Sequence, residues 1–430
     1  MTDLFHDRRP VSKPKLLWVK SRMPTAVRDG TSLVTLNLAE CLADVFDIDL
    51  VTMRITGTED SARKIISPPF QHVYITNPDN AGGVLRRAAY RLIYSVRAVL
   101  TGVPRAVFYW TGQGVRSCLQ DLFRKNMYAG VVFEYYTSAP LLSLANCPTA
   151  LLLIDATFQS LEYSCEGKSG ISLWMARWAA AVMKRFEMRA IKEPDHCLSI
   201  SERDIALFQA AGNNALIQYV PVLYPPLPIE PSLPTAQATK AGLCFMGNLR
   251  YDENRRALIW FLDKVFPLIR LRLPTATLTV IGGGQEAMPA LFRAMQGVVY
   301  SGWVDDLAAT LSTFAAGIAP SVSGTGVKIK VLEMMWHGLP VVATTIASAG
   351  TPAAKGGALI ADDPASFAEH AIGLLTNPEA RSKLRNNARQ ILEKDHCGPI
   401  AREAVRNIFQ AIADGDRQAR PHDETVEQAS

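Results

Sequence analysis

The sequence lacks several features that mark whole classes of proteins. Its seven cysteines are scattered and never spaced C-x-x-C, so we expect neither a disulfide framework nor a thiolate zinc site. No run reaches the roughly 18 apolar residues of a membrane-spanning helix, and the first residues have no apolar signal-peptide core. Lys and Arg number 45 against 40 Asp and Glu, a surplus too small to indicate nucleic acid as a partner. These absences favour a cytoplasmic protein.

The residues that are present indicate two α/β domains. The chain has 430 residues, of which 48% are hydrophobic, which is enough for two cores. Short apolar strands alternate with helical patterns, first from residue 16 and again from residue 242. Prolines crowd residues 221–234 between the two series. We therefore expect two facing, doubly wound parallel sheets of Rossmann-like type, with ligands in the cleft between them.

The expected organisation follows from these patterns. A flexible tail precedes the first domain, a proline-rich linker joins the domains, and a C-terminal helix returns to the first domain. The expected ranges are 1–13 for the tail, 14–220 for the first domain, 221–238 for the linker, 239–398 for the second domain, 399–414 for the returning helix, and 416–430 for a disordered tail.

Residues 317–345 carry the most informative pattern. A buried strand enters a glycine-rich loop, and a helix is predicted to begin near Val327. The first turn of a helix presents unpaired backbone N–H groups and a positive dipole end, which together suit a phosphate. Lys328 and Lys330 stand in these first turns, where cations are normally unfavourable unless an anion binds there. Glu333, about two turns in, could accept hydrogen bonds from a ribose diol. The alternative is an ordinary surface pair of Lys330 with Glu333.

This segment, GTGVKIKVLEMMWHGLPVVATTIASAG, resembles the signature of GT-B glycosyltransferases, specifically the retaining family 4 type, or glycosyl transferases group 1. The segments FMGNLRYDENRRALIWFLDKVFP, ATLTVIGGG and VVYSGWVDDLAATLSTF have the same order as in that family. The nearest resemblance is to sugar transferases of bacterial exopolysaccharide clusters. It implies a metal-independent hexosyltransferase without a cofactor. A UDP- or GDP-sugar would be the donor substrate, the acceptor would be a glycan or a lipid-linked sugar, and the product would serve polysaccharide or glycolipid biosynthesis.

The resemblance also implies roles for individual residues. Glu333, Lys330 and Asp155 would be catalytic, and Asp29 and Gly30 would form the loop that faces the acceptor and the sugar phosphate. Residues that would bind the donor nucleotide are Gly247, Asn248, Arg250, Arg255, Trp303, Val304, Ser323, Gly324, Thr325, Gly326, Val327, Lys328, Lys330 and Glu333.

Two positions depart from the family pattern. The usual carboxylate eight residues before Glu333 is replaced by Thr325, and Asp155 stands nearest to the usual histidine of the first domain. A catalytically degenerate protein that binds a sugar nucleotide is therefore an alternative.

Two further function classes are compatible with the patterns. The segment IGGGQEA at 281–287 formally satisfies G-x-G-x-x-A after a strand, as in an NAD-dependent dehydrogenase. A two-domain sugar-binding protein without catalysis would share the same cleft. Binding of a nucleoside diphosphate, of NAD, or of neither would separate the three classes.

Two helical stretches of the first half raise the question of a partner. Residues 84–100 place Arg86, Arg87, Arg91 and Arg97 on one arc, which fits peripheral contact with an anionic membrane at the inner face of the plasma membrane. The alternative is a helix packed on the first sheet with a solvated arginine face. Trp174 and Trp178, spaced i,i+4, are most simply interpreted as core residues.

Overall fold

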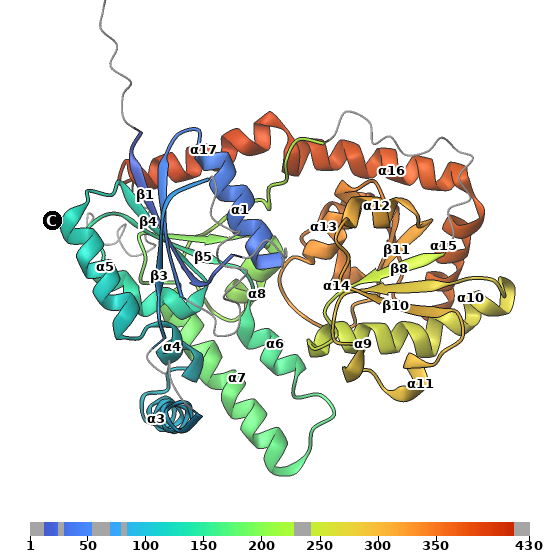
Figure 1. The fold of residues 1–430 in the computed structure, drawn as a ribbon, viewed down its shortest axis with the longest axis horizontal. Coiled ribbons are helices and arrows are strands. Elements are labelled where there is room, and N and C mark those ends of the chain that lie inside the picture. Colours follow the sequence, from blue (N-terminus) through green and yellow to red (C-terminus); the bar gives the residue numbers. More distant parts are fainter. Residues whose placement is uncertain (1–12, 25–29, 54–68, 79–83, 228–241, 417–430) are drawn as a thin grey trace, which may run out of the picture.

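The computed structural model describes residues 13–24, 30–53, 69–78, 84–227 and 242–416. Two open sheets form two domains that lie next to each other, the first at the left of Figure 1 and the second at the right. Helices cover both faces of each sheet, as expected for doubly wound α/β domains. No helix of the described residues has both the length and the apolar character needed to span a bilayer.

The first sheet has seven strands in the order β3-β2-β1-β4-β5-β6-β7. All of its pairings are parallel, and Lys20 of β1 lies opposite Glu134 of β4 in the register. Strands β3 and β7 were not predicted from the sequence. The strands are β1 (Lys15–Arg22), β2 (Asp47–Met53), β3 (Phe70–Thr76), β4 (Gly130–Glu134), β5 (Thr149–Leu153), β6 (His196–Ser199) and β7 (Ile217–Tyr219).

Alternating side chains of β1 divide the first domain into two layers. Leu16 and Trp18 belong to the core beneath α1 and the last helix, α17 (Pro399–Ala413), whereas Leu17 and Val19 belong to the core beneath α4, α5 and α7. The helical elements of this domain are α1 (Gly30–Leu42), α3 (Val84–Thr101), α4 (Arg105–Trp110), α5 (Gln113–Lys125), η1 (Tyr136–Leu144), α6 (Thr157–Tyr163), α7 (Gly170–Ala190) and α8 (Glu202–Ala210).

The second sheet has six strands in the order β10-β9-β8-β11-β12-β13, again with parallel pairings. Its strands are β8 (Leu243–Met246), β9 (Leu278–Ile281), β10 (Val298–Gly302), β11 (Ala316–Ala319), β12 (Val341–Ala343) and β13 (Leu359–Ile360). Its helical elements are α9 (Asp252–Trp260), η2 (Phe261–Val265), α10 (Phe266–Arg272), η3 (Gln285–Ala287), α11 (Ala290–Arg293), α12 (Leu307–Ser312), α13 (Ile329–Trp336), α14 (Thr345–Ser348), η4 (Pro352–Lys355), α15 (Pro364–Thr376), α16 (Pro378–Leu392) and η5 (Glu393–Cys397).

Helix α13 is held close to strand β11 by a glycine. A Cβ at Gly317 of β11 would lie 2.3 Å from the sulfur of Met334, so a larger residue would have to displace that side chain. The helix begins at Ile329 with Lys328 as its N-cap, two residues later than predicted. This close packing fixes where the glycine-rich loop 321–328 emerges.

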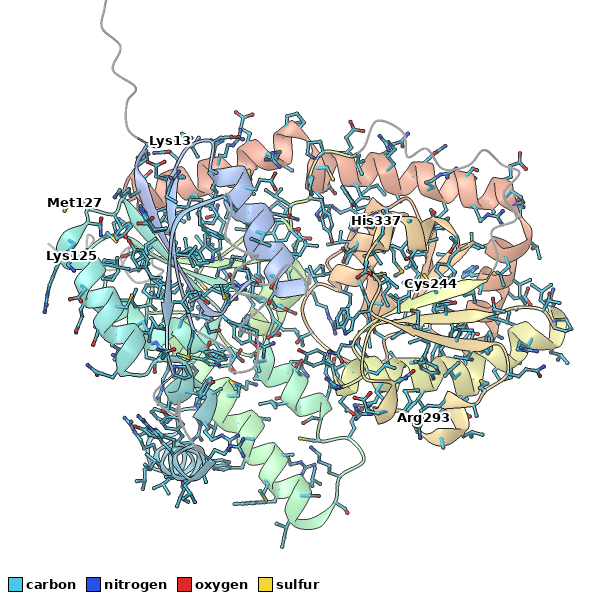
Figure 2. The ribbon with its side chains drawn as sticks, in the orientation of Figure 1. Lys13, Lys125, Met127, Cys244, Arg293 and His337 are labelled. Atoms are coloured by element: carbon cyan, nitrogen blue, oxygen red, sulfur yellow. The ribbon has the colours of Figure 1, made fainter. Side chains whose placement is uncertain are left out.

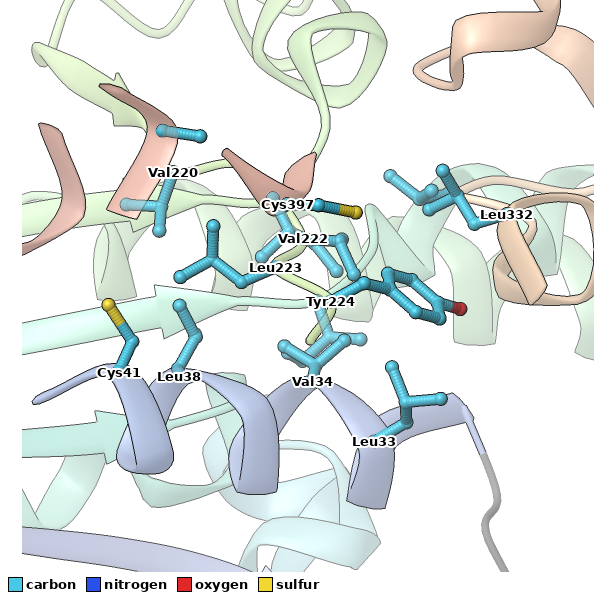
Figure 3. Packing of buried hydrophobic residues seen from close by; sticks show 14 of the residues in the cluster. Leu33, Val34, Leu38, Cys41, Val220, Val222, Leu223, Tyr224, Leu332 and Cys397 are labelled. Atoms are coloured by element: carbon cyan, nitrogen blue, oxygen red, sulfur yellow. The ribbon is translucent and has the colours of Figure 1, made fainter. Parts of the chain in front are cut away.

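The two domains are joined by a continuous apolar core. Figure 3 shows Tyr224 between Val34 of α1 and Leu332 of α13, with Val222 and Cys397 beside it. The first part of the proline-rich segment is fixed here, since Trp336 donates its indole N–H to the Pro225 carbonyl at 3.0 Å. Residues 228–238 of the expected linker lie outside the described residues.

The last helix, α17 (Pro399–Ala413), crosses from the second domain and lies along the first (Figure 1). The Phe409 ring stacks on Trp18 of β1 with 6.0 Å between the ring centroids. Figure 2 shows the side chains of both domains filling the layers between sheet and helices. On one side of the molecule the two domains are joined by residues 220–227 and α17, which we call the hinge. On the opposite side, the carboxyl ends of the strands of the two sheets face each other.

Candidate active site

A pocket of about 500 Å³ lies between the two domains. It opens where strands β1, β4, β5 and β6 of the first sheet end and where the glycine-rich loop leads into α13. Open parallel sheets bind ligands at this edge, because the loops that follow the strands gather there. The lining residues are Lys20, Ser21, Arg22, Gly30, Thr31, Val34, Trp110, Glu134, Tyr135, Ile154, Asp155, Ile200, Tyr251, Asn254, Thr325, Gly326, Val327, Lys328, Ile329 and Lys330.

Two helices begin at this pocket from opposite sides. A Cβ at Gly30, the first residue of α1, would lie 3.1 Å from the Ile329 side chain at the start of α13. The positive dipole ends of both helices therefore point toward the same space, which favours an anion there. Asp29, which was expected beside Gly30, lies outside the described residues.

The first domain contacts the glycine-rich loop directly. Gly326 has φ +70°, and a Cβ on it would lie 3.1 Å from Cβ of Asp155, so both conformation and space require glycine. The Asp204 carboxylate of α8 accepts the Gly326 N–H at 3.0 Å, and Arg203 donates to the Gly324 carbonyl at 3.1 Å. The Ser160 and Thr325 hydroxyls are hydrogen-bonded at 2.7 Å. Burial raises the pKa of Asp204 to about 6.

Two lysines bring positive charge to the second-domain side of the pocket. Lys330 donates to Asn254 Oδ1 at 2.7 Å, and its ammonium lies 4.8 Å from the centre of the Phe245 ring. Desolvation of this enclosed ammonium group, together with the charge of Lys328, lowers the pKa of Lys330 to about 7. Lys328 bonds to the Thr325 carbonyl and pairs with Glu253 at 3.5 Å. An anion in the pocket would favour the charged form of Lys330.

Glu333 lies one turn after Lys330 on α13 and is 8% exposed. Lys330 bonds to Asn254 and Glu333 is buried, so the two residues are not an exposed surface pair, the alternative interpretation of this spacing. In the preceding loop, the buried Ser323 hydroxyl has no hydrogen-bond partner among the described residues. Buried hydroxyls are almost always paired in folded proteins, so this position is suited to a polar ligand atom.

Asp155 closes the pocket from the end of β5. It accepts hydrogen bonds from the Thr157 hydroxyl at 2.7 Å and the Tyr135 hydroxyl at 3.2 Å. Burial raises the pKa of Asp155, which the two hydrogen bonds partly offset. Tyr135 has φ 74°, a conformation that non-glycine residues seldom adopt outside functional regions.

The sequence reasoning missed several polar pocket residues, and four of them make the contacts described here. Lys20 and Glu134, at the ends of β1 and β4, form an ion pair whose side chains are 4% and 2% exposed. Glu134 also accepts from the Trp18 indole at 3.0 Å and from the Thr35 hydroxyl at 2.7 Å. Asn254 and Tyr135 complete the set. A charged residue directly after an apolar strand was the available signal for Lys20 and Glu134.

Other expected donor-binding residues lie outside this lining. Gly247 packs against Asn254, whose amide donates to the Asn248 carbonyl at 3.0 Å. Trp303 is exposed and lies against Gly283, and Val304 follows it. The two arginines are paired elsewhere: Arg250 with Glu286 at 2.8 Å, and Arg255 with Asp252.

The glycines of 281–287 do not open a long helix, as a dinucleotide-binding fingerprint requires. They lead into the three-residue turn η3 and the four-residue helix α11. A Cβ at Gly282 would lie 2.4 Å from the Gly247 carbonyl oxygen, so this glycine serves close packing between β8 and β9. The dehydrogenase interpretation of this motif is therefore wrong.

A larger hollow, of about 930 Å³, lies behind the hinge. Its walls come from the linker, α16 and α17, with Arg389, Arg402 and Arg406 among the lining residues. Arg406 of this lining pairs with Asp44. None of its lining residues belongs to the strand ends, so the smaller interdomain pocket is the candidate site.

Comparison with known proteins gives a family match within the second domain. Residues 240–377 match the family model described as glycosyl transferases group 1. An uncharacterized 44.6 kDa protein in the cps region of Klebsiella pneumoniae is 31% identical over 166 residues, which are 36% of this chain. The match spans 42% of the length of that relative.

Solved structures resemble the chain over nearly its whole length. TarM aligns with a TM-score of 0.66 at 9% identity, covering 94% of this chain and 99% of TarM. Anabaena Alr3699/HepE, in complex with UDP and glucose, aligns with a TM-score of 0.63 at 12% identity, covering 93% and 100%. At this identity the likeness concerns the fold alone. The two domains have the GT-B fold, as the sequence predicted.

Proposed function

We propose that this protein transfers a sugar from a nucleotide-diphosphate sugar to a glycan or lipid-linked acceptor, with retention of the anomeric configuration. The observation that carries the proposal is the interdomain pocket on which α1 and α13 both begin, with Lys328 and Lys330 beside it. Breaking the glycosidic bond of such a donor leaves negative charge on the departing diphosphate. Helix-end amides and lysines placed there in advance stabilise that charge where it develops.

The donor is a UDP-sugar in this proposal, in preference to a GDP-sugar. Alr3699/HepE is described in complex with UDP and glucose, and a mutant of S. aureus TarM in complex with UDP. Glu333 would hold the ribose hydroxyls, and Gly326, Val327, Lys328 and Lys330 the diphosphate. The other expected donor contacts are Gly247, Asn248, Arg250, Arg255, Trp303, Val304, Ser323, Gly324 and Thr325.

The transfer itself would need no divalent metal, because the lysines and helix ends supply the positive charge. Asp155, at the first-domain wall of the pocket, would hydrogen-bond to the sugar. Burial raises the pKa of Asp155, because it disfavours the charged carboxylate. Gly30 would approach the sugar phosphate from the start of α1.

The biological role we propose is the synthesis of a bacterial surface polysaccharide or glycolipid. The relative encoded in a Klebsiella pneumoniae cps region supports it. The protein would act in the cytoplasm, at the inner face of the plasma membrane, with the first domain binding the acceptor. Residues 84–100 would provide the contact with anionic lipid.

A donor-hydrolysis and transfer assay with UDP-glucose and related UDP-sugars tests the proposal. Glu333→Ala should lower transfer at least 100-fold, and Lys330→Ala should weaken UDP binding, with both variants folded. Lys264→Ala is the matched control, because Lys264 is an exposed lysine of the same domain, paired with Asp263. Wild-type activity in both site variants would refute the assignment.

A protein that binds the sugar nucleotide without turning it over is the second candidate. It is favoured by Thr325, whose hydroxyl is paired with Ser160 and which stands where the family pattern has a carboxylate. Saturable UDP binding without release of UDP from any UDP-sugar, at any acceptor concentration, would select it.

A further inference from the structure

Exposed apolar side chains are concentrated on two helices of the first domain. Of the twenty large apolar side chains that are exposed in the described residues, six lie on α3 and four on α7. Single exposed apolar residues are ordinary, but a concentration of this kind marks an interaction surface. The ten are Leu85, Leu92, Ile93, Val96, Val99, Leu100, Ile171, Trp174, Met175 and Trp178.

Helix α3 turns its apolar side away from the protein. Its buried residues are Tyr94 and Ala98, and Tyr94 stacks against Phe108 of α4. At 100° per residue, the six exposed apolar residues of α3 fall within one arc of about 120°, opposite Tyr94. Figure 2 shows the side chains of this helix projecting from the domain at the lower left. The alternative for this segment is therefore only partly right: Arg86, Arg91 and Arg97 are exposed, as it expected, but the helix packs on α4 rather than on the sheet.

Positive charge borders the apolar arc. Helix α3 contains four arginines and no acidic residue. Arg97 lies over the Phe108 ring, 4.6 Å from its centre, and Arg86 lies over Tyr90 on the same helix. An apolar strip edged by arginines is the pattern of a helix that lies in a membrane interface.

Helix α7 repeats the pattern with tryptophans. Ile171, Trp174, Met175 and Trp178 follow the i, i+3, i+4, i+7 spacing of one helix face. The core role predicted for the two tryptophans is wrong, because Trp174 is 67% and Trp178 39% exposed. Tryptophan is enriched where an apolar phase meets water. The one acid of this helix, Glu187, is fully buried and accepts the Thr157 and Phe158 backbone N–H groups.

The two helices lie on the same face of the first sheet. Helix α3 packs on α4, and both α4 and α7 pack on η1. In Figure 1 they lie below the sheet, α3 seen end-on and α7 extending away from the domain. We call the ten apolar residues with Arg86, Arg91, Arg97 and Arg177 the α3–α7 surface.

We propose that the α3–α7 surface docks the first domain onto an anionic lipid bilayer, which would present a lipid-linked acceptor to the interdomain pocket. The inference about the acceptor rests on the proposed function, whereas the docking itself does not. Charge complementarity favours a bilayer over a second copy of the chain. Neither helix exposes an acidic residue that could pair with the arginines of a second copy. Anionic lipid headgroups, in contrast, would pair with these arginines.

Co-sedimentation of the whole protein with vesicles tests this proposal. Vesicles of phosphatidylglycerol with phosphatidylcholine should bind the protein, and vesicles of phosphatidylcholine alone should bind it at least tenfold more weakly. The combined change Leu92→Ser with Val96→Ser, and separately Trp174→Ser with Trp178→Ser, should each lower binding at least tenfold. Arg86→Glu with Arg91→Glu should do the same.

Matched controls are available in the second domain. Leu271→Ser with Leu291→Ser removes two leucines that are 81% and 74% exposed, and should leave vesicle binding unchanged. Thermal stabilisation by UDP should be the same in all these variants, so loss of docking is separable from loss of the proposed function. Undiminished vesicle binding by the surface variants would overturn the proposal. So would a concentration-dependent dimer that these changes dissociate, without vesicle binding by the wild type.

Discussion

The two domains supply different chemistry to the pocket between them. The second domain contributes Tyr251, Asn254 and one continuous segment, residues 325–330, which carries glycine, two lysines and the start of a helix. The first domain contributes residues from the ends of four separate strands, and its charges are largely neutralised in place, as in the Lys20–Glu134 pair. The proposed binding of the diphosphate thus depends mainly on the second domain, whereas the first provides a preformed polar wall.

Gly326→Ala should have the largest effect, because Gly326 of the second domain lies directly against Asp155 and Asp204 of the first. The new Cβ would meet Asp155 Cβ at 3.1 Å and the Ile154 carbonyl oxygen at 3.3 Å, and alanine would be strained at the φ of +70°. We expect transfer to fall at least 100-fold, measured as UDP release. Gly356→Ala is the control, since Gly356 also has positive φ but has no atom within 4 Å of the added Cβ. If both variants lost the same transfer activity, backbone strain at a positive φ would explain the result, and the contact of Gly326 with Asp155 would not.

Lys20→Met should have the next largest effect, on stability. It would leave Glu134 buried and without its cation, and losing one partner of a buried pair costs about 3–5 kcal/mol. Denaturant unfolding of the variant measures this, and adding Glu134→Gln should restore much of the loss. Lys355→Met is the control, because the Lys355 side chain of the Lys355–Asp395 pair is 61% exposed and such pairs contribute about 0–1 kcal/mol. A small loss of unfolding free energy in Lys20→Met would contradict a preformed polar wall in the first domain.

The difference between the domains also explains what the sequence could predict. Glycine loop, lysines and Glu333 are neighbours in the chain, so their relation could be inferred without knowing the fold. Lys20 and Glu134 meet only because β1 and β4 are adjacent in the sheet, although more than a hundred residues separate them. The alternation of strands and helices predicted two parallel sheets, but it did not predict the order of the strands.

Two other differences have a similar cause. Asp204 is at the start of a helix in an ordinary polar context, and only the approach of the domains brings it to Gly326. Trp174 and Trp178 follow a helical apolar spacing that is equally typical of a core face and of an exposed interface. Periodicity shows which residues share a face, but not what that face contacts.

The pH dependence of UDP binding should show a smaller effect, from Lys330. Burial and Lys328 lower its pKa to about 7, and a bound diphosphate would raise it, so binding takes up a proton above that pH. The dissociation constant should therefore increase above pH 7, by at most about tenfold per pH unit. Calorimetric titration between pH 6 and 9 measures it. Lys330→Met should bind weakly with a flat profile, and a flat wild-type profile would contradict the role of Lys330.

Asp204→Asn should have the smallest effect, on thermal stability. The folded-state pKa of Asp204, about 6, lies above its unfolded value, so wild-type stability falls as pH rises from about 4 to 6. Asparagine can still accept the Gly326 N–H without carrying charge. The melting temperature of the variant should exceed that of the wild type by about 2–6 °C at pH 7.5 and match it near pH 4.5. An offset that is the same at both pH values would contradict this assignment.

Hydrogen exchange of the backbone amides, with and without UDP, tests most directly whether the start of α13 holds a nucleotide diphosphate. Peptides covering residues 324–331 should exchange more slowly with UDP, as should peptides covering 248–256, and Lys330→Met should remove both effects. NAD should leave these peptides unchanged. Unaltered exchange at 324–331 in saturating UDP, or protection confined to 281–287, would contradict the placement of the donor.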